Sequence, residues 1–231
     1  GEPRVRLPEN DPKSVILRNR LAYGRIAAEW ERRQEMDYDH GFHEQCRALF
    51  LSHLKGIRVL DAGCGLGLDS LAFAAAGLQV AASDIAEEFL PLIRRKQPRI
   101  GLAAMDLTAP CFRAGCFDGI FACASFLHVP HELVEQTLSG FVRMLASGGI
   151  LFLHHVESSR GLSEYRIDEL LIPDNPAVCF CHTEQQLSAL LASAGLHVLA
   201  VGRLKPSKYP SPCADRNSLV PYQMIACKPV S

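Results

Sequence analysis

The residue types best suited to chemistry lie in the segment VLDAGCGLGLDSLAFAAAGLQVAASD, at 59–84, where an acid is followed by closely spaced glycines. An apolar run ends near Asp61, and a second apolar run ends at Asp84. The glycines between them are Gly63, Gly65 and Gly67. Glycine is needed where a backbone turns tightly and a ligand approaches with no side chain between. A carboxylate that ends the second run could accept two hydrogen bonds from ribose hydroxyls, so this turn is predicted to bind a nucleotide-like ligand.

The spacing of these glycines distinguishes two classes of ligand. Dinucleotide loops follow G-x-G-x-x-G, in which the third glycine allows close helix packing. Leu68 stands where that last glycine is wanted, which argues against NAD. Asp61, before the glycines, is an acid suited to a ligand amine.

An alternation of short apolar runs with longer helical segments predicts the elements that position this turn. Strands are predicted at 57–63, 79–84, 100–106, 117–123 and 149–157, with helices at 67–76, 86–96, 130–146 and from Thr183 to Gly195. Near-continuous apolar strands alternating with helices indicate a parallel sheet covered on both faces. The last two strands, 197–204 and 222–227, follow one another with only a loop between them, so they could pair antiparallel at one edge.

Two helices are predicted upstream of the sheet, from Pro12 to about Met36 and over 41–54. No linker separates them, so residues 1–56 are predicted to form a helical lid of the same domain, whose core is 57–231. The chain has 231 residues, 48% of them hydrophobic, and a net charge of −1. Binding to nucleic acid mainly by charge is therefore disfavoured.

The nine cysteines are scattered, which is typical of reduced thiols rather than a disulfide framework. No apolar run approaches the length of a membrane span and no apolar signal core is found near the start. We therefore expect a cytoplasmic protein with no membrane partner; the oligomeric state is not indicated.

Taken together, these motifs resemble those of class I S-adenosylmethionine-dependent methyltransferases. The resemblance covers roughly residues 20–202 and includes the glycine turn, Asp84, an acid ending the third strand and the block FDGIFACASFLHVP. Within that family the chain looks most like small stand-alone methyltransferases with an ASLLHVP-type block, here ASFLHVP at 124–130. The resemblance implies an α/β, Rossmann-like, seven-stranded, mostly parallel sheet with helices on both faces and an antiparallel edge strand.

The resemblance also implies roles for individual residues toward S-adenosyl-L-methionine and its product S-adenosyl-L-homocysteine. Asp61 and the three glycines would hold the methionine end, with Cys64 presenting its backbone. Asp84 would hold the ribose. The adenine would contact Ile85, Asp106 and Leu107, the ligand amine would meet the backbone of Ala124, and Tyr23 would fold over the cofactor. Arg25 is a further candidate for the methionine carboxylate.

His128, in the ASFLHVP block, is the candidate catalytic base, because histidine can take a proton near neutral pH. A pocket-lining or structural role for it is equally compatible with the sequence. His154 and His155 are adjacent in a strand, so at most one of them faces the pocket and a metal there is improbable. Cys179, Cys181 and His182 lack a fourth ligand at workable spacing and are interpreted as structural. No metal is predicted.

The acceptor is predicted to be a small molecule methylated at O, N or S. Two alternatives stay open, a tRNA wobble-uridine-type methyltransferase and a non-catalytic S-adenosylmethionine-binding protein. The acceptor pocket is expected under the N-terminal helices and the 157–182 insertion. The candidate lining residues are Tyr23, Trp30, Tyr38, His40, His43, Arg160, Tyr165 and Arg166.

Overall fold

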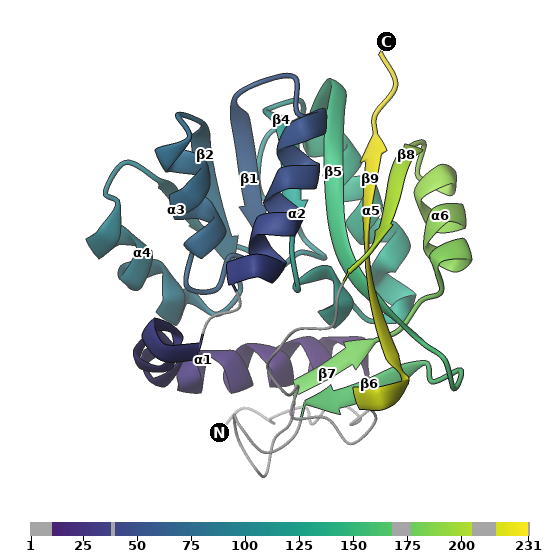
Figure 1. Ribbon diagram of the computed structural model, residues 1–231, viewed down its shortest axis with the longest axis horizontal. Coiled ribbons are helices and arrows are strands. Elements are labelled where there is room, and N and C mark those ends of the chain that lie inside the picture. Colours follow the sequence, from purple (N-terminus) through teal and green to yellow (C-terminus); the bar gives the residue numbers. More distant parts are fainter. Residues whose placement is uncertain (1–10, 38–39, 168–176, 205–215, 231) are drawn as a thin grey trace, which may run out of the picture.

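A computed structural model describes residues 11–37, 40–167, 177–204 and 216–230. In these ranges a seven-stranded sheet stands between helices, with α1 crossing below the strand ends (Figure 1). The strands of the sheet are β1 (Arg58–Ala62), β2 (Gln79–Asp84), β3 (Gly101–Ala104), β4 (Phe117–Ala122), β5 (Leu145–Ser158), β8 (His197–Arg203) and β9 (Leu219–Cys227).

The strand order is β3-β2-β1-β4-β5-β9-β8. The first five strands are parallel, whereas β9 runs antiparallel to both β5 and β8. The predicted Rossmann-like, mostly parallel sheet is confirmed, and so is the antiparallel pairing of its last two strands. The reversed strand β9 lies one place in from the edge, which β8 forms.

Helices cover both faces of the sheet. They are α1 (Pro12–Asp37), α2 (His40–His53), α3 (Leu68–Ala75), α4 (Leu90–Lys96), α5 (Val134–Met144) and α6 (Glu184–Ser193). In the part of the chain that the structure describes, four short 3-10 turns join these elements: η1 (Glu87–Phe89), η2 (Phe126–His128), η3 (His131–Leu133) and η4 (Arg216–Ser218). In Figure 1, α2 and α3 lie in front of the sheet and α5 lies behind it.

Aromatic side chains fill the core on the α2 face. Phe121 of β4 stacks on Phe152 of β5 with centroids 4.5 Å apart, and Phe50 and Phe73 close over Phe121 from α2 and α3. Gly119 leaves room for this packing, since a Cβ there would lie 2.6 Å from the Phe50 ring. The sheet is thereby fixed against the two helices whose N-termini face the strand ends.

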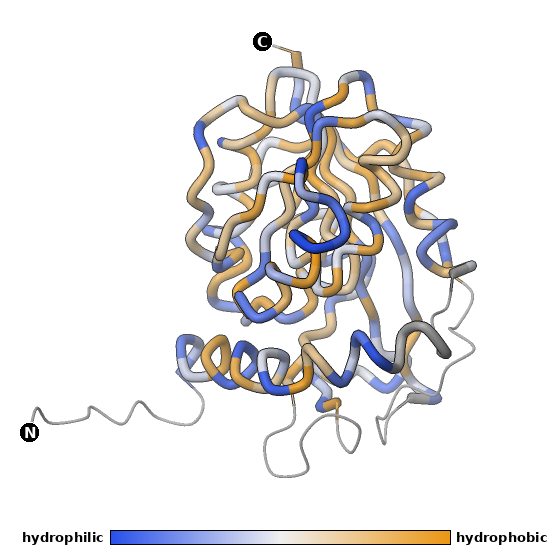
Figure 2. Tube along the Cα trace, turned by 90° about the vertical axis from the view of Figure 1, so that its left-hand side faces the viewer, coloured by the Kyte–Doolittle hydropathy of each residue, from blue (hydrophilic) through white to orange (hydrophobic). Residues whose placement is uncertain are grey.

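Helix α1, the first helix of the predicted lid over residues 1–56, lies apart from the sheet layers and alternates hydrophilic and hydrophobic turns (Figure 2). It packs on the hairpin of β6 (Glu164–Ile167) and β7 (Ala177–Phe180). The side chain of Asn19 hydrogen-bonds to both backbone groups of Val178. Nδ2 of Asn19 donates to the Val178 carbonyl at 2.9 Å, and the Val178 backbone amide donates to Oδ1 of Asn19 at 2.8 Å. The lid and the hairpin therefore form one layer under the sheet.

Two expectations about the elements were wrong. The helix predicted over 130–146 begins later, because Pro130 has an extended ψ of 145° and a 3-10 turn precedes α5. That helix also ends earlier, since β5 begins at Leu145, where it pairs with Phe117. The β6–β7 hairpin was not predicted.

Candidate functional site

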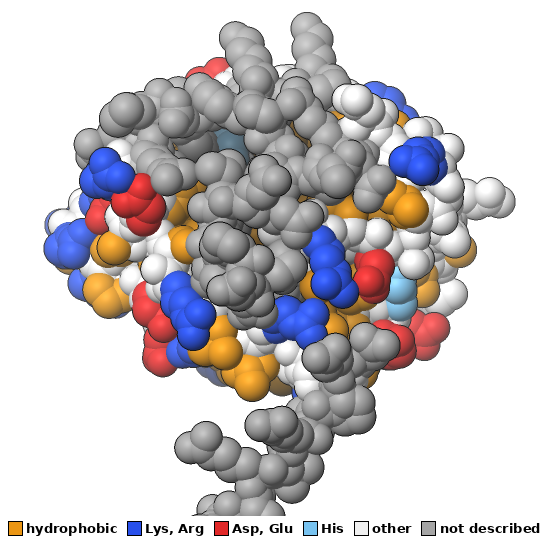
Figure 3. Space-filling view, turned by 90° about the horizontal axis from the view of Figure 1, so that it is seen from below, with side chains coloured by type: hydrophobic (Ala, Val, Ile, Leu, Met, Phe, Trp, Pro, Cys, Tyr) orange, Lys and Arg blue, Asp and Glu red, His pale blue; other side chains and the backbone are white. Residues whose placement is uncertain are grey.

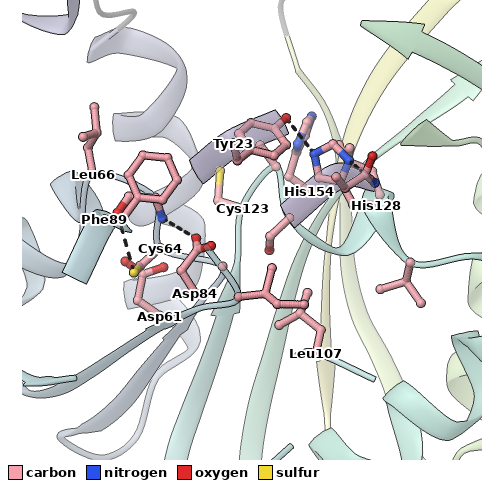
Figure 4. A pocket seen from close by; sticks show the side chains of 18 of the residues that line it. Tyr23, Asp61, Cys64, Leu66, Asp84, Phe89, Leu107, Cys123, His128 and His154 are labelled. Atoms are coloured by element: carbon pink, nitrogen blue, oxygen red, sulfur yellow. Dashed lines mark hydrogen bonds between the residues drawn. The ribbon is translucent and has the colours of Figure 1, made fainter. Parts of the chain in front are cut away.

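A cavity of about 400 Å³ opens where the carboxyl ends of β1, β2 and β4 face α1. Its lining comes from α1, α2, the loops after β1, β2, β3 and β4, and the ends of β5 and β6. Eleven of the twelve sequence-predicted site residues lie in this lining: Tyr23, Asp61, Gly63, Cys64, Gly65, Asp84, Ile85, Asp106, Leu107, Ala124 and His128. Figure 4 shows several of these side chains converging from different elements.

The glycine turn is held by backbone hydrogen bonds to the neighbouring strand. The amides of Gly63 and Cys64 donate to the Ser83 carbonyl at 2.8 and 2.9 Å. Gly65 has a φ of +48°, which favours glycine, and a Cβ added there would meet no atom within 4 Å. The space that a side chain would fill at Gly65 therefore belongs to the cavity.

Gly67, the twelfth predicted residue, does not line the cavity. Its φ is +72°, and a Cβ there would lie 2.5 Å from Cγ1 of Ile93 in α4. Gly67 is thus required for the left-handed turn and for packing of α3 against α4. Its predicted contact with a ligand is not supported by its position.

Asp84 ties the glycine turn to the end of β2. One carboxylate oxygen accepts from the Gly65 amide and the other from the Ala86 amide, both at 2.8 Å. Burial raises the pKa of Asp84 to about 6 despite these bonds. A group that donates hydrogen bonds to this carboxylate would favour its charged form.

Asp61, at the end of β1, is the more deeply buried acid, with 2% of its surface exposed. It accepts a hydrogen bond of 2.5 Å from the Ser70 hydroxyl. Burial, and then the neighbouring Asp69, raise the pKa of Asp61 to about 8. A cationic ligand group placed here would offset that penalty on the carboxylate.

Asp106 follows β3, and one of its carboxylate oxygens accepts from the amide and the hydroxyl of Thr108, both at 2.8 Å. These two hydrogen bonds to one oxygen fix the direction of the carboxyl group. Ile85 and Leu107 supply apolar lining beside it. Ala124, after β4, has a φ of +53°, a strained value for a residue with a side chain.

Tyr23 of the lid and His128 of η2 form a pair over the cavity. The Tyr23 hydroxyl lies 2.9 Å from Nε2 of His128 (Figure 4). Nδ1 of His128 lies 2.9 Å from the Val178 carbonyl. A carbonyl can only accept, so Nδ1 carries the proton and Nε2 accepts from Tyr23. Burial lowers the pKa of His128 to about 4, which keeps the ring neutral.

Several further polar residues in the lining were not predicted as cofactor or catalytic residues, among them His43, Asp69, Cys123 and His154. The Asp69 carboxylate accepts hydrogen bonds from Nδ1 of His43 at 2.8 Å and from Arg47 at 2.6 Å. Possible ligand atoms of His43, Asp69 and Cys123 lie within 4.8 Å of one another. Arg47 and His43 account for the buried carboxylate of Asp69 by hydrogen bonding, so this cluster is explained without an ion. These contacts join distant segments and carried no local sequence signal.

The other expectations for the pocket have mixed outcomes. Trp30, His43 and Tyr165 line the cavity, whereas Arg25, Arg160 and Arg166 are exposed and do not. Tyr38 and the side chain of His40 lie outside the described residues. Of the adjacent histidines only His154 lines the cavity, as strand alternation predicted; His155 bonds instead to His182 at 2.9 Å.

Comparisons with known proteins show what the chain is similar to. Residues 59–149 match the family model of a methyltransferase domain. A ubiquinone biosynthesis O-methyltransferase of Xanthomonas campestris pv. campestris (strain B100) is 36% identical over 107 residues, 43% of each chain. The S-adenosyl-L-methionine-dependent Diels-Alderase iliD of Neonectria sp. (strain DH2) is 28% identical over 125 residues, 53% of this chain and 49% of that protein. The chain spans about half the length of the curated relatives it matches.

Among solved structures, the 1,6-didemethyltoxoflavin-N1-methyltransferase of Burkholderia thailandensis, with bound 1,6-didemethyltoxoflavin and S-adenosylhomocysteine, superposes with a TM-score of 0.72. The match covers 97% of this chain and 93% of that one at 22% identity, so it concerns the fold. The fold is therefore the Rossmann-like sheet that the sequence predicted, and residues 59–149 within it are similar to a methyltransferase domain. Within the described ranges, no helix combines the length and apolar character that a membrane crossing requires.

Proposed function

We propose that the chain is an S-adenosylmethionine-dependent methyltransferase acting on a small-molecule acceptor. The observation that carries this proposal is the convergence of the predicted residues on one cavity at the carboxyl ends of parallel strands, where such sheets bind ligands. The open space at Gly65 and the half-buried, hydrogen-bonded acid Asp84 fit the ribose and methionine parts of that cofactor.

The chain's own residues would position the reactants. Asp84 would accept from the ribose hydroxyls, Asp61 would face the ammonium group, and Asp106 would face the adenine amine. S-adenosylmethionine, when bound, would supply an electrophilic methyl group, which passes to the acceptor as the bond to sulfur breaks and S-adenosylhomocysteine leaves. Holding the reacting atoms in line can contribute about 7–11 kcal/mol to lowering the barrier. The lid helix α1 would keep water out of the cavity.

The Tyr23–His128 pair supports a proton path for an acceptor that must lose a proton. The acceptor would give its proton to the Tyr23 oxygen while Tyr23 passes its own proton to Nε2 of His128. Nδ1 keeps its proton on the Val178 carbonyl throughout. A neutral amine would not need this path before the methyl transfer.

A small acceptor is favoured over a nucleic acid by the distribution of charge. On the face seen from below, acidic and basic side chains are interspersed (Figure 3). The chain as a whole is nearly neutral. Sequence-independent nucleic-acid binding instead depends on clustered Lys and Arg.

The test is calorimetry with S-adenosylmethionine and S-adenosylhomocysteine, followed by measurement of S-adenosylhomocysteine formation with candidate acceptors. Binding with acceptor-dependent product supports the proposal, and absence of binding contradicts it. A second function, a cofactor-dependent reaction without methyl transfer, is favoured by the relationship to the Diels-Alderase. Tight binding with substrate conversion and no S-adenosylhomocysteine would support that function instead.

A further inference from the structure

The charges around the cavity restrict what the acceptor can be. Among the described lining residues there is no Lys or Arg, while four are aspartates: Asp61, Asp69, Asp84 and Asp106. Arg47 lies behind the lining and is engaged with Asp69. A desolvated anion requires a cation or several donors to hold it. The described wall offers an anionic group of an acceptor no such partner.

The part of the cavity beyond the proposed cofactor residues is largely apolar. Side chains of α1, η2, β6 and the segment that follows η2 form this wall: Ile16, Leu127, Val129, Tyr165 and Ile167. The Tyr165 hydroxyl in this wall is hydrogen-bonded to Cys179. Two polar side chains beside the wall are also engaged, since Asn19 is bonded to Val178 and His128 to Tyr23. A flat or branched apolar body would therefore fit this wall better than a hydrated one.

His154, in β5, is the exception in this apolar region. It is 6% exposed, and neither of its ring nitrogens has a hydrogen-bond partner among the described residues. Burial, and then the charge of His43, lower the pKa of His154 to about 3, so the ring is neutral. A neutral imidazole offers one donor and one acceptor. A buried polar group without a partner costs free energy, which a bound hydroxyl or N–H group would recover.

We propose that the methyl acceptor is an uncharged, largely apolar molecule whose polar group, away from the reacting atom, is held by His154. A neutral phenol, aryl amine or nitrogen heterocycle has this chemistry. The proposal rests on the proposed function for the reaction itself, but the preference of the cavity for neutral molecules can be measured independently of turnover.

The experiment uses two fluorescent probes with one framework. N-phenyl-1-naphthylamine is neutral and carries an N–H group, and 8-anilinonaphthalene-1-sulfonate adds a single sulfonate. The protein is titrated with each probe, with and without saturating S-adenosylhomocysteine. We expect the neutral probe to bind at least about tenfold more tightly. Equal or tighter binding of the sulfonate, or no saturable binding of the neutral probe, overturns the proposal.

The position of the probes is checked with Ile167→Arg, which adds a cation to the apolar wall. This variant is expected to shift the preference toward the sulfonate by about tenfold or more. An unchanged preference would show that the probes bind elsewhere and that the wild-type ratio does not reflect the cavity, which overturns the interpretation.

The role of His154 is tested with His154→Leu and His154→Gln. The leucine variant removes an unpaired polar group and is expected to fold, which thermal unfolding verifies. It should bind the neutral probe about five- to tenfold more weakly, while glutamine should stay within about threefold. Unchanged binding by His154→Leu overturns the role of His154. Failure of S-adenosylhomocysteine to bind contradicts the proposed function alone, because the probe ratio is still measurable without it.

Discussion

At the scale of single residues, the two carboxylates at the strand ends differ in their surroundings. Asp84 accepts hydrogen bonds from two backbone amides, whereas Asp61 accepts one from the Ser70 hydroxyl and lies near Asp69. Burial raises the pKa of both, but less for Asp84. Near neutral pH, Asp84 is thus mostly a ready acceptor, while Asp61 needs a cation beside it to ionise.

Lowering the pH through about 6 is expected to weaken S-adenosylhomocysteine binding, because Asp84 takes up a proton there. The carboxylate, and with it the ribose bonds, is present above that pH and lost below it. A hydrogen bond to a charged group contributes about 1.5–3 kcal/mol. Calorimetry at pH values from about 5 to 7 measures the change.

Asp84→Asn is the control for that titration. It should bind roughly ten- to a hundredfold more weakly near pH 7 and show no comparable loss on acidification. If wild type and variant had the same affinity across this range, Asp84 would not contact the ligand.

The pH dependence of turnover is expected to reflect His128 only in acid, because burial lowers its pKa to about 4. For a reaction that needs the proton path, the rate should rise through about pH 4 and then level off. His128→Ala should lower kcat about a hundredfold or more. Steady-state rates with an acceptor that supports turnover provide the measurement.

His128→Asn distinguishes a base from a positioning residue, since the amide can still donate to the Val178 carbonyl but cannot take the proton. Recovery of the wild-type rate in this variant would assign His128 a positioning role. Tyr23→Phe should resemble His128→Ala if the two residues act as one path.

At the scale of elements, the glycines of the turn meet two different structural requirements, which their regular spacing in the sequence does not distinguish. Gly65 faces open cavity, and Gly67 faces Ile93 of the neighbouring helix. One position thus leaves space for a ligand and the other allows α3 and α4 to pack. Substitution by alanine separates these roles, because both backbones are left-handed and share that strain.

Gly67→Ala is expected to lower the free energy of unfolding by about 1–3 kcal/mol more than Gly65→Ala, because only the former forces a contact of 2.5 Å. Gly65→Ala should cause the larger loss of S-adenosylhomocysteine affinity. Urea denaturation and calorimetry on both variants test this pair. Equal losses of stability would contradict the packing role of Gly67.

The elements that sequence predicted well are those with local signals. The strands from 58 to 122 are apolar runs bounded by turns, and the loop after β1 has its glycines in the sequence itself. The β6–β7 hairpin was not predicted because each strand has only four residues, which is too short to show a clear alternation of polar and apolar side chains. The pairing of Tyr23 with His128 joins residues more than a hundred positions apart, and sequence periodicity does not encode such a contact. Nor does it encode that the ring nitrogens of His154 lack a partner among the described residues.

At the scale of the whole molecule, the Val178 carbonyl joins the lid to the site. It accepts from Asn19 of α1 and from Nδ1 of His128, so the hairpin orients both the lid and the candidate base. Tyr23, one turn beyond Asn19 on α1, then reaches Nε2 of the same ring. Closure of the cavity and alignment of the proton path are therefore one structural state.

Asn19→Ala is expected to loosen that state. It removes two buried hydrogen bonds and leaves the Val178 amide without its acceptor, a loss of about 1–3 kcal/mol. Hydrogen exchange should speed up in α1 and β7 while the sheet strands stay protected, since local opening involves the least tightly held segments.

Arg32→Ala, which removes an exposed ion pair with Glu29 on the same helix, is the matched control and should leave exchange unchanged. Saturating S-adenosylhomocysteine should restore protection of α1 in Asn19→Ala, because a ligand that binds only the closed state stabilises it by mass action. Unaltered exchange of α1 in Asn19→Ala would mean that the lid is held by its apolar contacts alone and that the hairpin does not couple it to His128.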